Sequence, residues 1–255
     1  MALKLFDLTG RRALITGSSQ GIGLALAGGL AAAGAEVVLN GRDAGRLAAA
    51  VAELKGRKLK ASGSAFDVTD ENEVKAAVDA IERDHGAIDI LINNAGMQLR
   101  GPLEDYRPED FRKIMRVNVE SVFLVAQAVA RHMIARKRGR IINIGSVQSE
   151  LGRATIAPYT ATKGAVKMLT KGMCADWAKH GLQINAIGPG YFKTPLNQAL
   201  VDNPEFSGWL EKRTPAGRWG NVEELAGAAV FLASDAASFV NGHMLYVDGG
   251  MTSVV

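Results

Sequence analysis

Cysteine is nearly absent from this chain of 255 residues, which holds only Cys174 and therefore cannot form an internal disulfide. Long hydrophobic runs are also missing: no stretch of about 18 uncharged apolar residues occurs, so we predict no membrane-spanning helix. The four histidines lie far apart and show no metal-ligand spacing, which argues against a metal site. Residues 1–7 lack the charged-then-apolar pattern of a signal peptide, so we expect a cytoplasmic location.

Charge of one sign is not in large excess. The chain has 30 Lys and Arg against 26 Asp and Glu, a formal net charge of +4. The basic residues are spread along the chain, and the one dense cluster, residues 136–140, is typical of a solvated turn between a helix and a strand. We therefore expect no nucleic-acid partner and no membrane partner, whereas an anionic small molecule suits the mildly basic surface.

Short apolar runs alternate with longer amphipathic stretches, without an internal repeat. Hydrophobic residues make up 47% of the chain, enough for a sizeable core. This pattern predicts one α/β domain over residues 1–255: a Rossmann-type, doubly wound parallel sheet flanked by helices on both faces. The expected strands end near residues 16, 39, 65–68, 92, 145, 187 and 247. One long helix is expected from Phe111 to about Arg136.

A glycine-rich turn follows the first expected strand. The run Gly17-Ser18-Ser19-Gln20-Gly21-Ile22-Gly23 separates that strand from a helical stretch over residues 24–33. Glycines permit a tight turn and close backbone approach, and the helix start offers free N–H groups to a pyrophosphate. Such turns also occur for purely steric reasons, but the order strand, glycines, helix is the context that nucleotide binding requires.

The end of the second expected strand bears on the choice between NADP and NAD. An acidic residue at this position would bind the ribose hydroxyls and repel a 2′-phosphate. This chain has Asn40-Gly41-Arg42 instead, where Gly41 leaves room and Arg42 can contact phosphate. We predict NADP, with NAD possible if Arg42 is only a solvated turn residue. Asp67, after the third strand, either binds the adenine amino group or forms a turn.

Polar and small residues follow two later strands. Asn93-Asn94-Ala95-Gly96 suits a turn packed against a ligand, or else an Asx-turn. Arg100, a little further on, is either a cation for a substrate carboxylate or a surface charge. Pro189 and Gly190 fix another turn, and Thr194 is placed to contact a carboxamide. The proline-containing segment 191–218 is interpreted as an insertion over the sheet edge that acts as a substrate lid.

Candidate catalytic residues gather in the region 146–163. Tyr159 and Lys163 are four residues apart, hence on one face of an expected helix, and Ser146 closes an apolar strand. A free phenol has a pKa of about 10, which a nearby cation lowers. Lys163 supplies that cation, and Ser146 can hydrogen-bond a substrate oxygen; the alternative is a plain helix surface pair. Asn118 places an amide among apolar neighbours, where it either holds a water near Lys163 or bonds the backbone and kinks the helix.

In this order and spacing the motifs resemble the classical short-chain dehydrogenases/reductases over about residues 8–250. The resemblance implies a catalytic tetrad of Asn118, Ser146, Tyr159 and Lys163, with Tyr159 as acid/base. Gln20 departs from the pattern, because NADP-preferring members often carry Arg or Lys there. The implied cofactor-binding residues are Gly17, Ser19, Gln20, Gly21, Ile22, Gly23, Asn40, Arg42, Asp67, Val68, Asn94, Ala95, Gly96, Tyr159, Lys163, Pro189, Gly190 and Thr194.

Segments such as residues 149–153 and 212–220 are similar to those of family members that oxidise D-gluconate at C5 and reduce 5-keto-D-gluconate. This implies a sugar-acid substrate and, from the family, a homotetramer. Other readings are a 3-oxoacyl-carrier-protein reductase, another sugar or polyol dehydrogenase, and a non-catalytic nucleotide sensor. The expected substrate-binding residues are Arg100, Ser146, Glu150, Arg153 and Tyr159.

Overall fold

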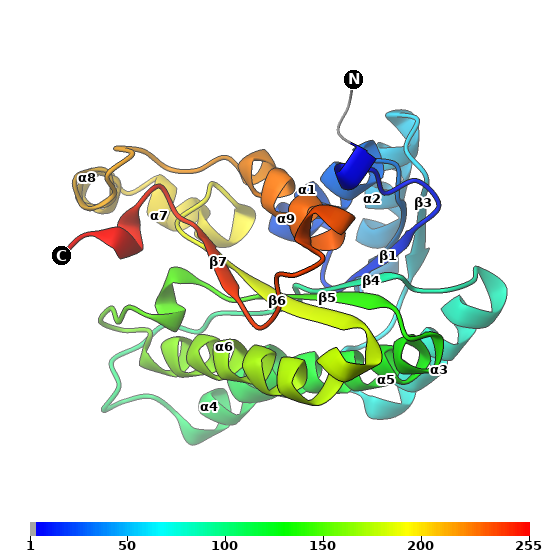
Figure 1. Cartoon of the computed structure of the whole chain (residues 1–255). Helices are drawn as coiled ribbons and strands as arrows, with labels where there is room; N and C mark the ends of the chain where they lie inside the picture. The colour runs from blue at the N-terminus through cyan, green and yellow to red at the C-terminus, as the bar shows by residue number, and fades with distance from the viewer. Residues whose placement is uncertain (1–3) are drawn as a thin grey trace.

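The computed structural model describes residues 4–255 and contains one parallel sheet of seven strands (Figure 1). The strand order is β3-β2-β1-β4-β5-β6-β7, so the chain starts in the middle, winds to one edge and returns to build the other. This confirms the predicted doubly wound α/β fold. The strands are β1 Arg12–Ile15, β2 Glu36–Asn40, β3 Ala61–Ser64, β4 Ile90–Asn93, β5 Gly139–Ile144, β6 Leu182–Pro189 and β7 Met244–Val247.

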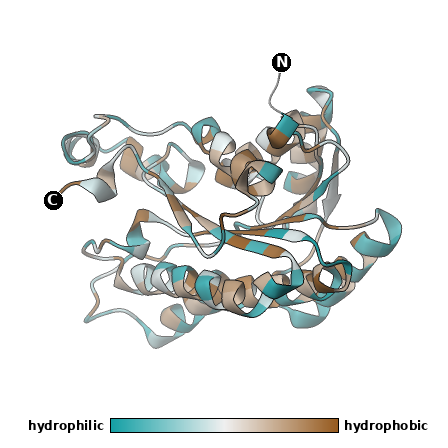
Figure 2. Ribbon diagram, viewed as in Figure 1, coloured by the Kyte–Doolittle hydropathy of each residue, from teal (hydrophilic) through white to brown (hydrophobic). Residues whose placement is uncertain are grey.

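Helices cover both faces of the sheet because alternate strand residues point to opposite sides. Ile15 and Ile92 pack with one set of helices, α1, α2 and α9, whereas Leu14 and Leu91 pack with the other, α3, α5 and α6. Strand residues are mostly apolar, and hydrophilic residues gather on the outer helices (Figure 2). The helices are α1 Gly21–Ala32, α2 Ala44–Gly56, α3 Glu71–Asp84, α4 Pro108–Met115, α5 Ser121–Arg136, α6 Ala157–Trp177, α7 Gln198–Val201, α8 Pro204–Arg213 and α9 Ala226–Ala233.

The long helix expected from Phe111 to Arg136 is not uniform. Helix α4 passes into a five-residue π-helical turn, Arg116–Glu120, before α5 begins at Ser121. Single π turns inside α-helices widen the backbone locally and often mark functional sites. Asn118 lies within this turn, so the widening falls at a residue that the sequence had marked.

The segment 191–218 lies over one end of the sheet, where it contains α7 and α8 (Figure 1). A separate small core anchors it, in which Leu210 of α8 and Trp219 pack with Val147 and Met251. Within residues 4–255, no helix has both the length and the hydrophobicity that a bilayer-spanning segment requires. Nor do these residues contain a group of three or more His, Cys, Asp or Glu side chains placed to hold a metal ion.

Candidate active site

The sheet and its helices bring the four predicted catalytic residues to one place. Ser146 follows the end of β5, and α6 supplies Tyr159 and Lys163 from its first two turns. The π turn of Asn118 packs on α6. In doubly wound sheets, ligands bind outside the carboxyl ends of the strands, beside the point where the strand order reverses. Here that point lies between β1 and β4, next to β5.

Lys163 is anchored beneath the tyrosine ring. Its Nζ donates a 2.8 Å hydrogen bond to the carbonyl of Ile144, and lies 5.6 Å from the centre of the Tyr159 ring. The side chain is nearly inaccessible, and burial lowers the pKa of Lys163 from 10.5 to about 8. An ammonium group held this way is fixed in position and gives up its proton more readily than an exposed lysine.

Burial acts on Tyr159 in the opposite direction. It raises the pKa of the phenol to about 12, although a hydrogen bond with Ser146 and the charge of Arg100 both lower it. The sequence had suggested that the neighbouring lysine would make this phenol acidic. In the protein chain itself desolvation dominates, because a buried phenolate loses its hydration, and the groups that lower this pKa are Ser146 and Arg100 rather than Lys163. The group is therefore held as a neutral proton donor at neutral pH.

Ser146 is oriented by its own backbone neighbourhood. Its Oγ accepts a hydrogen bond from the backbone N–H of Gln148 at 3.1 Å, in the short 3-10 turn Val147–Ser149. The Oγ is also hydrogen-bonded with Tyr159. A hydroxyl that already accepts from the backbone keeps its proton free to donate. Ser146 and Tyr159 thus place two hydroxyl groups next to each other at one point of the site.

The Asn118 side chain makes three hydrogen bonds. Its Oδ1 accepts from the backbone N–H of Met97 at 2.8 Å, and its Nδ2 donates to the Met97 carbonyl at 2.9 Å and to Thr162 Oγ1 at 3.1 Å. The amide therefore ties the π turn both to the loop after β4 and to α6. These bonds go to tertiary partners rather than to the backbone of its own helix, so they differ from the second sequence alternative; the water near Lys163 stays a prediction.

The glycine-rich turn leaves the start of α1 open. The N-cap residue Gln20 makes no side-chain capping bond, so the first N–H groups of the helix are free for a phosphate. Gly17 and Gly21 have φ angles of +58° and +59°, which side chains rarely adopt. A Cβ on Gly23 would lie 2.6 Å from the Gly17 carbonyl oxygen, so this position has room only for glycine. Ile22 packs against the first core.

Asparagines join this turn to the neighbouring strands. Asn94 donates from Nδ2 to the carbonyls of Thr16 and Gly17, both at 2.9 Å. The backbone N–H groups of Asn94 and Ala95 donate to Thr16 Oγ1. Asn40 accepts from the Gly17 N–H at 3.2 Å and donates to Phe66. Asn40 is buried, and its hydrogen bonds support the turn from behind.

Arg42 stands at the outer rim of the same cleft. Its side chain is 75% exposed and lies 3.6 Å from Asp67. Burial by itself would raise the pKa of Asp67, but hydrogen bonds from Thr69 and the charge of Arg42 outweigh it and lower the pKa. Gly41 places its open side against Ser19. A cation, a hydroxyl and a side-chain-free position thus adjoin one another at the end of β2.

The remaining predicted cofactor residues are structural or close to the tetrad. Val68 is buried in the second core, and Pro189 ends β6. A Cβ on Gly190 would lie 2.8 Å from the Asp248 backbone, so close packing requires glycine there. Thr194 caps the turn Pro195–Asn197. Gly96 lies against the tetrad, where an added Cβ would be 3.4 Å from Asn118 Oδ1.

A pocket with about 370 Å³ of empty space opens beside Ser146 and Tyr159. Arg100 and Arg153 both line it, and neither forms an ion pair within residues 4–255. Burial, and then the charge of Arg153, lower the pKa of Arg100, which shows that the two cations share this space. Their loops are also linked, since the Gly101 N–H donates to the Thr155 carbonyl at 3.0 Å.

Glu150 is not brought into this pocket. Its carboxylate pairs with Lys167 on the outside of α6, and it does not appear among the pocket-lining residues. Residues that the sequence did not single out do line it: Gln148 beside Ser146, and Tyr191, Asn197 and Leu200 from the segment 191–218. Tyr191 and Leu200 come from the expected lid, so the predicted position of that segment could have indicated that they line the pocket. Gln148 carried no signal of its own.

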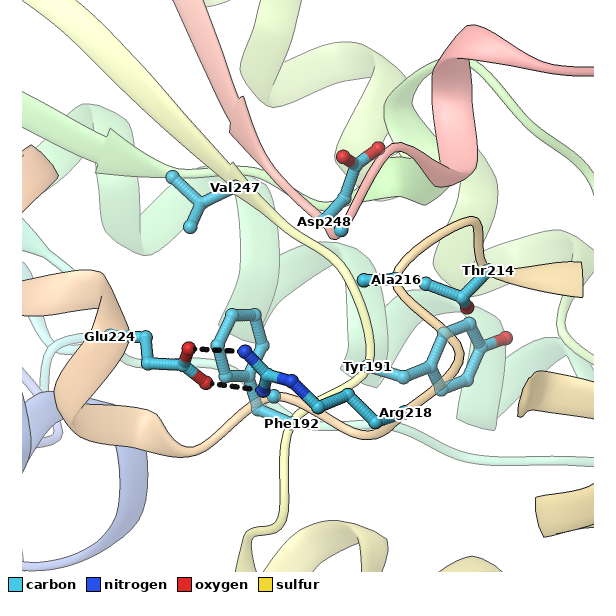
Figure 3. Close-up of a pocket in the computed structure, with 10 residues that line it drawn as sticks. Tyr191, Phe192, Thr214, Ala216, Arg218, Glu224, Val247 and Asp248 are labelled. Atoms are coloured by element: carbon cyan, nitrogen blue, oxygen red, sulfur yellow. Dashed lines mark hydrogen bonds and ion pairs between the residues drawn. The ribbon is translucent and has the colours of Figure 1, made fainter.

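A second cavity, with about 450 Å³ of empty space, shares Tyr191 with the first pocket (Figure 3). Its charged groups already have partners. Arg218 makes two hydrogen bonds to Glu224, at 2.8 and 2.7 Å, and Asp248 accepts bonds from Gly250 and Thr252. The tetrad is absent from its walls. Of the two cavities, the one beside Ser146 and Tyr159 is therefore the one that contains predicted catalytic residues.

Comparison with known proteins places this arrangement in a family. A family model described as enoyl-(acyl carrier protein) reductase matches residues 17–252. The chain belongs to the short-chain dehydrogenase/reductase family, as the motifs predicted.

Two similar relatives carry names of sugar-acid enzymes. Gluconate 5-dehydrogenase of Gluconobacter oxydans (strain 621H) is 64% identical over 97% of this chain and 97% of its own length. 5-Keto-D-gluconate 5-reductase of Escherichia coli (strain K12) is 54% identical over 98% of this chain and 99% of the relative. The crystal structure of a gluconate 5-dehydrogenase from Burkholderia cenocepacia J2315, in complex with NADP and tartrate, has a TM-score of 0.97 and 61% identity, with both chains covered completely.

Proposed function

We propose that this chain catalyses the reversible, NADP-dependent oxidation of D-gluconate to 5-keto-D-gluconate. The observation that carries the proposal is the pocket that Tyr159 shares with Arg100 and Arg153, two cations without acidic partners among residues 4–255. Such a pocket suits a substrate that has a carboxylate at one end and a reacting hydroxyl near the other. The names of the two relatives, which are 64% and 54% identical, support the same substrate.

In this proposal Tyr159 and Ser146 act on the reacting oxygen of the substrate. In reduction, Tyr159 gives its proton to the substrate oxygen while Ser146 donates a hydrogen bond to that oxygen. Because burial raises the pKa of Tyr159 to about 12, the phenol is protonated and ready for this step. A bound nicotinamide supplies or accepts the hydride and, when oxidised, brings a positive charge that favours the phenolate.

Lys163 and Asn118 support the tyrosine. Lys163 holds its charge below the Tyr159 ring, which supports its proposed contact with the nicotinamide ribose. Asn118 keeps the loop after β4 in contact with α6 through Met97 and Thr162. A proton relay that runs past Asn118 is part of the proposal, and it would require a water beside the π turn.

NADP is the proposed cofactor because of the residues at the outer rim of the cleft, at the end of β2. Arg42 is exposed there, and Ser19 adjoins Gly41. A 2′-phosphate can exchange the weak Arg42–Asp67 contact for a charge-assisted bond to the guanidinium. Since Gln20 supplies no second cation, NAD is expected to be used with lower efficiency rather than excluded.

Nicotinamide absorbance with a panel of substrates tests the function. D-Gluconate with NADP and 5-keto-D-gluconate with NADPH should give the highest kcat/KM, above other sugar acids, neutral polyols and an acetoacetyl thioester. Turnover of the thioester above that of the sugar acids would favour the acyl-carrier alternative. Binding of NADPH without turnover of any of these compounds would favour a nucleotide sensor.

Assembly into a homotetramer in the cytoplasm is the remaining part of the proposal. Large apolar side chains are exposed on the outer helices and one loop; Phe123 on α5, Met168 on α6 and Phe239 are 43%, 61% and 103% exposed. Apolar groups of this size on adjoining helices are typical of surfaces that a second copy covers. Sedimentation of Phe123→Lys and Met168→Lys variants should show smaller particles than the parent chain.

A further inference from the structure

Gln148 is built into the wall of the pocket. It lies two residues beyond Ser146 in the turn Val147–Ser149, and its backbone N–H holds the serine Oγ. The residue is 6% exposed, and it lines the same pocket as Tyr159. A side chain on this turn has little freedom to leave, because the neighbouring Val147 is fixed in the small core.

One atom of its amide is left over. Among residues 4–255, Gln148 Oε1 is buried and has no hydrogen-bond partner. The other side of the amide faces Tyr191; burial raises the pKa of this phenol, against the opposing charges of Arg153 and Arg100 and the hydrogen bonds from Gln148 and Arg153. With the NH₂ directed to the phenol, the free oxygen is an acceptor that requires a donor from within the pocket.

The other polar groups of the pocket have tasks already. Arg100 and Arg153 suit the carboxylate, and Ser146 and Tyr159 suit the reacting oxygen. These contacts alone would not tell a sugar acid from a plain keto acid of the same length. The other side-chain amides of the pocket already have partners: Asn197 donates to the Phe192 carbonyl at 3.0 Å, and Gln98 accepts from Arg100.

We propose that Gln148 Oε1 accepts a hydrogen bond from a hydroxyl of the substrate chain between the reacting carbon and the carboxylate. Gln148 is then the residue that selects polyhydroxylated keto acids over deoxygenated ones. An acceptor buried without a partner penalises any substrate that lacks a hydroxyl there. This assignment rests on the proposed sugar-acid function and adds to it the residue that recognises a substrate hydroxyl.

Two substrates with the same carboxylate and ketone positions test the assignment. These are 5-keto-D-gluconate and 5-oxohexanoate, which lacks all the hydroxyls; kcat/KM is measured for each with NADPH, or Ki for 5-oxohexanoate if its turnover is too slow. Gln148→Met keeps the length of the side chain and removes the acceptor. Gln127→Met, the same change on the remote helix α5, is the matched control.

Gln148→Met should lower kcat/KM for 5-keto-D-gluconate by about ten- to hundredfold, mainly through KM, and leave the value for 5-oxohexanoate unchanged or higher. The control should alter neither substrate. An equal loss with both substrates would mean that Gln148 only supports the wall, and an unchanged preference would remove it from recognition; either result overturns the assignment. If the parent chain itself does not reduce 5-keto-D-gluconate, the proposed function fails before this question arises.

Discussion

The two halves of the active site differ in how their polar groups are satisfied. On the tetrad side, Asn118 makes three hydrogen bonds and Lys163 is fastened to the Ile144 carbonyl. On the substrate side, Arg100 and Arg153 have no ion pair within residues 4–255, and Gln148 Oε1 has no partner there. One half is complete within the chain, and the other is completed by a ligand.

This difference indicates where rate and selectivity reside. Groups whose positions are fixed before the substrate arrives act on the transition state, so their loss lowers kcat. Groups that wait for a partner contribute to binding, so their loss raises KM. The following predictions test this division, with the largest expected effects first and Glu150→Gln placed beside Arg153→Met as its control.

Tyr159→Phe should have the largest effect. Removal of the proton donor is expected to lower kcat by about a thousandfold or more, because general acid catalysis contributes about 10²–10⁴ and the substrate oxygen also loses a hydrogen bond. The dissociation constant of NADPH, measured by fluorescence titration, should change little. Retention of more than a tenth of the parent kcat would show that the tetrad side does not carry the chemistry.

Arg153→Met should act on binding instead. The variant retains an apolar stem to pack against Phe206, over which the guanidinium now lies at 5.2 Å from the ring centre. KM for D-gluconate is expected to rise about ten- to hundredfold while kcat stays within about threefold, since the charge-assisted bond to the carboxylate is lost. Steady-state kinetics measure both constants.

Glu150→Gln serves as the contrast to Arg153→Met, because Glu150 pairs with Lys167 outside the pocket. It should change KM by less than about twofold, as expected for an exposed ion pair. A larger rise in KM for Glu150→Gln than for Arg153→Met would reverse the assignment of the substrate side.

The pH dependence of reduction should reveal Lys163. Its pKa is lowered to about 8, so the ammonium is present below pH 8 and is lost as the pH rises above it. Tyr159, with a pKa of about 12, stays protonated through this range. We therefore expect kcat/KM for 5-keto-D-gluconate to fall above about pH 8. A plateau that extends to pH 10 would show that the charge of Lys163 is not required.

Arg42→Ala should have the smallest effect of the substitutions that bear on function. The exposed guanidinium is expected to contribute about five- to tenfold to the preference for NADP, because a solvated charge pair is worth only about 1 kcal/mol. The kcat/KM values for NADP and NAD give the ratio directly. A lower value for NAD in the variant, with NADP unaffected, would contradict the role of Arg42 in cofactor choice.

Much of the fold and the convergence of the tetrad could be predicted from the sequence. Apolar runs marked the strands, and the spacing of Tyr159 and Lys163 placed both on one helix face. The π turn at Asn118 could not be predicted, because it depends on tertiary bonds to Met97 and Thr162 rather than on local preference. For the same reason the raised pKa of Tyr159 was missed, since desolvation depends on the whole site.

The substrate pocket was the least predictable part. Glu150 and Arg153 are only three residues apart in the sequence. Glu150 nevertheless turns outward to Lys167, whereas Arg153 lines the pocket. The local sequence does not distinguish them, because tertiary packing determines the conformation of the loop between β5 and α6. In this loop Thr155 has a φ of +67°. Gln148 from the turn after β5 and Tyr191 from the segment 191–218 likewise come together only in the folded chain.

The product formed from D-gluconate and NADP tests the central proposal most directly. Carbon-13 NMR of the reaction mixture should show a new ketone at C5, with one NADPH formed per molecule oxidised, and no such product with the Tyr159→Phe variant. A ketone at C2 or C3, or no oxidation of D-gluconate by the parent chain, would contradict the proposed placement of the substrate between the two arginines and the tyrosine.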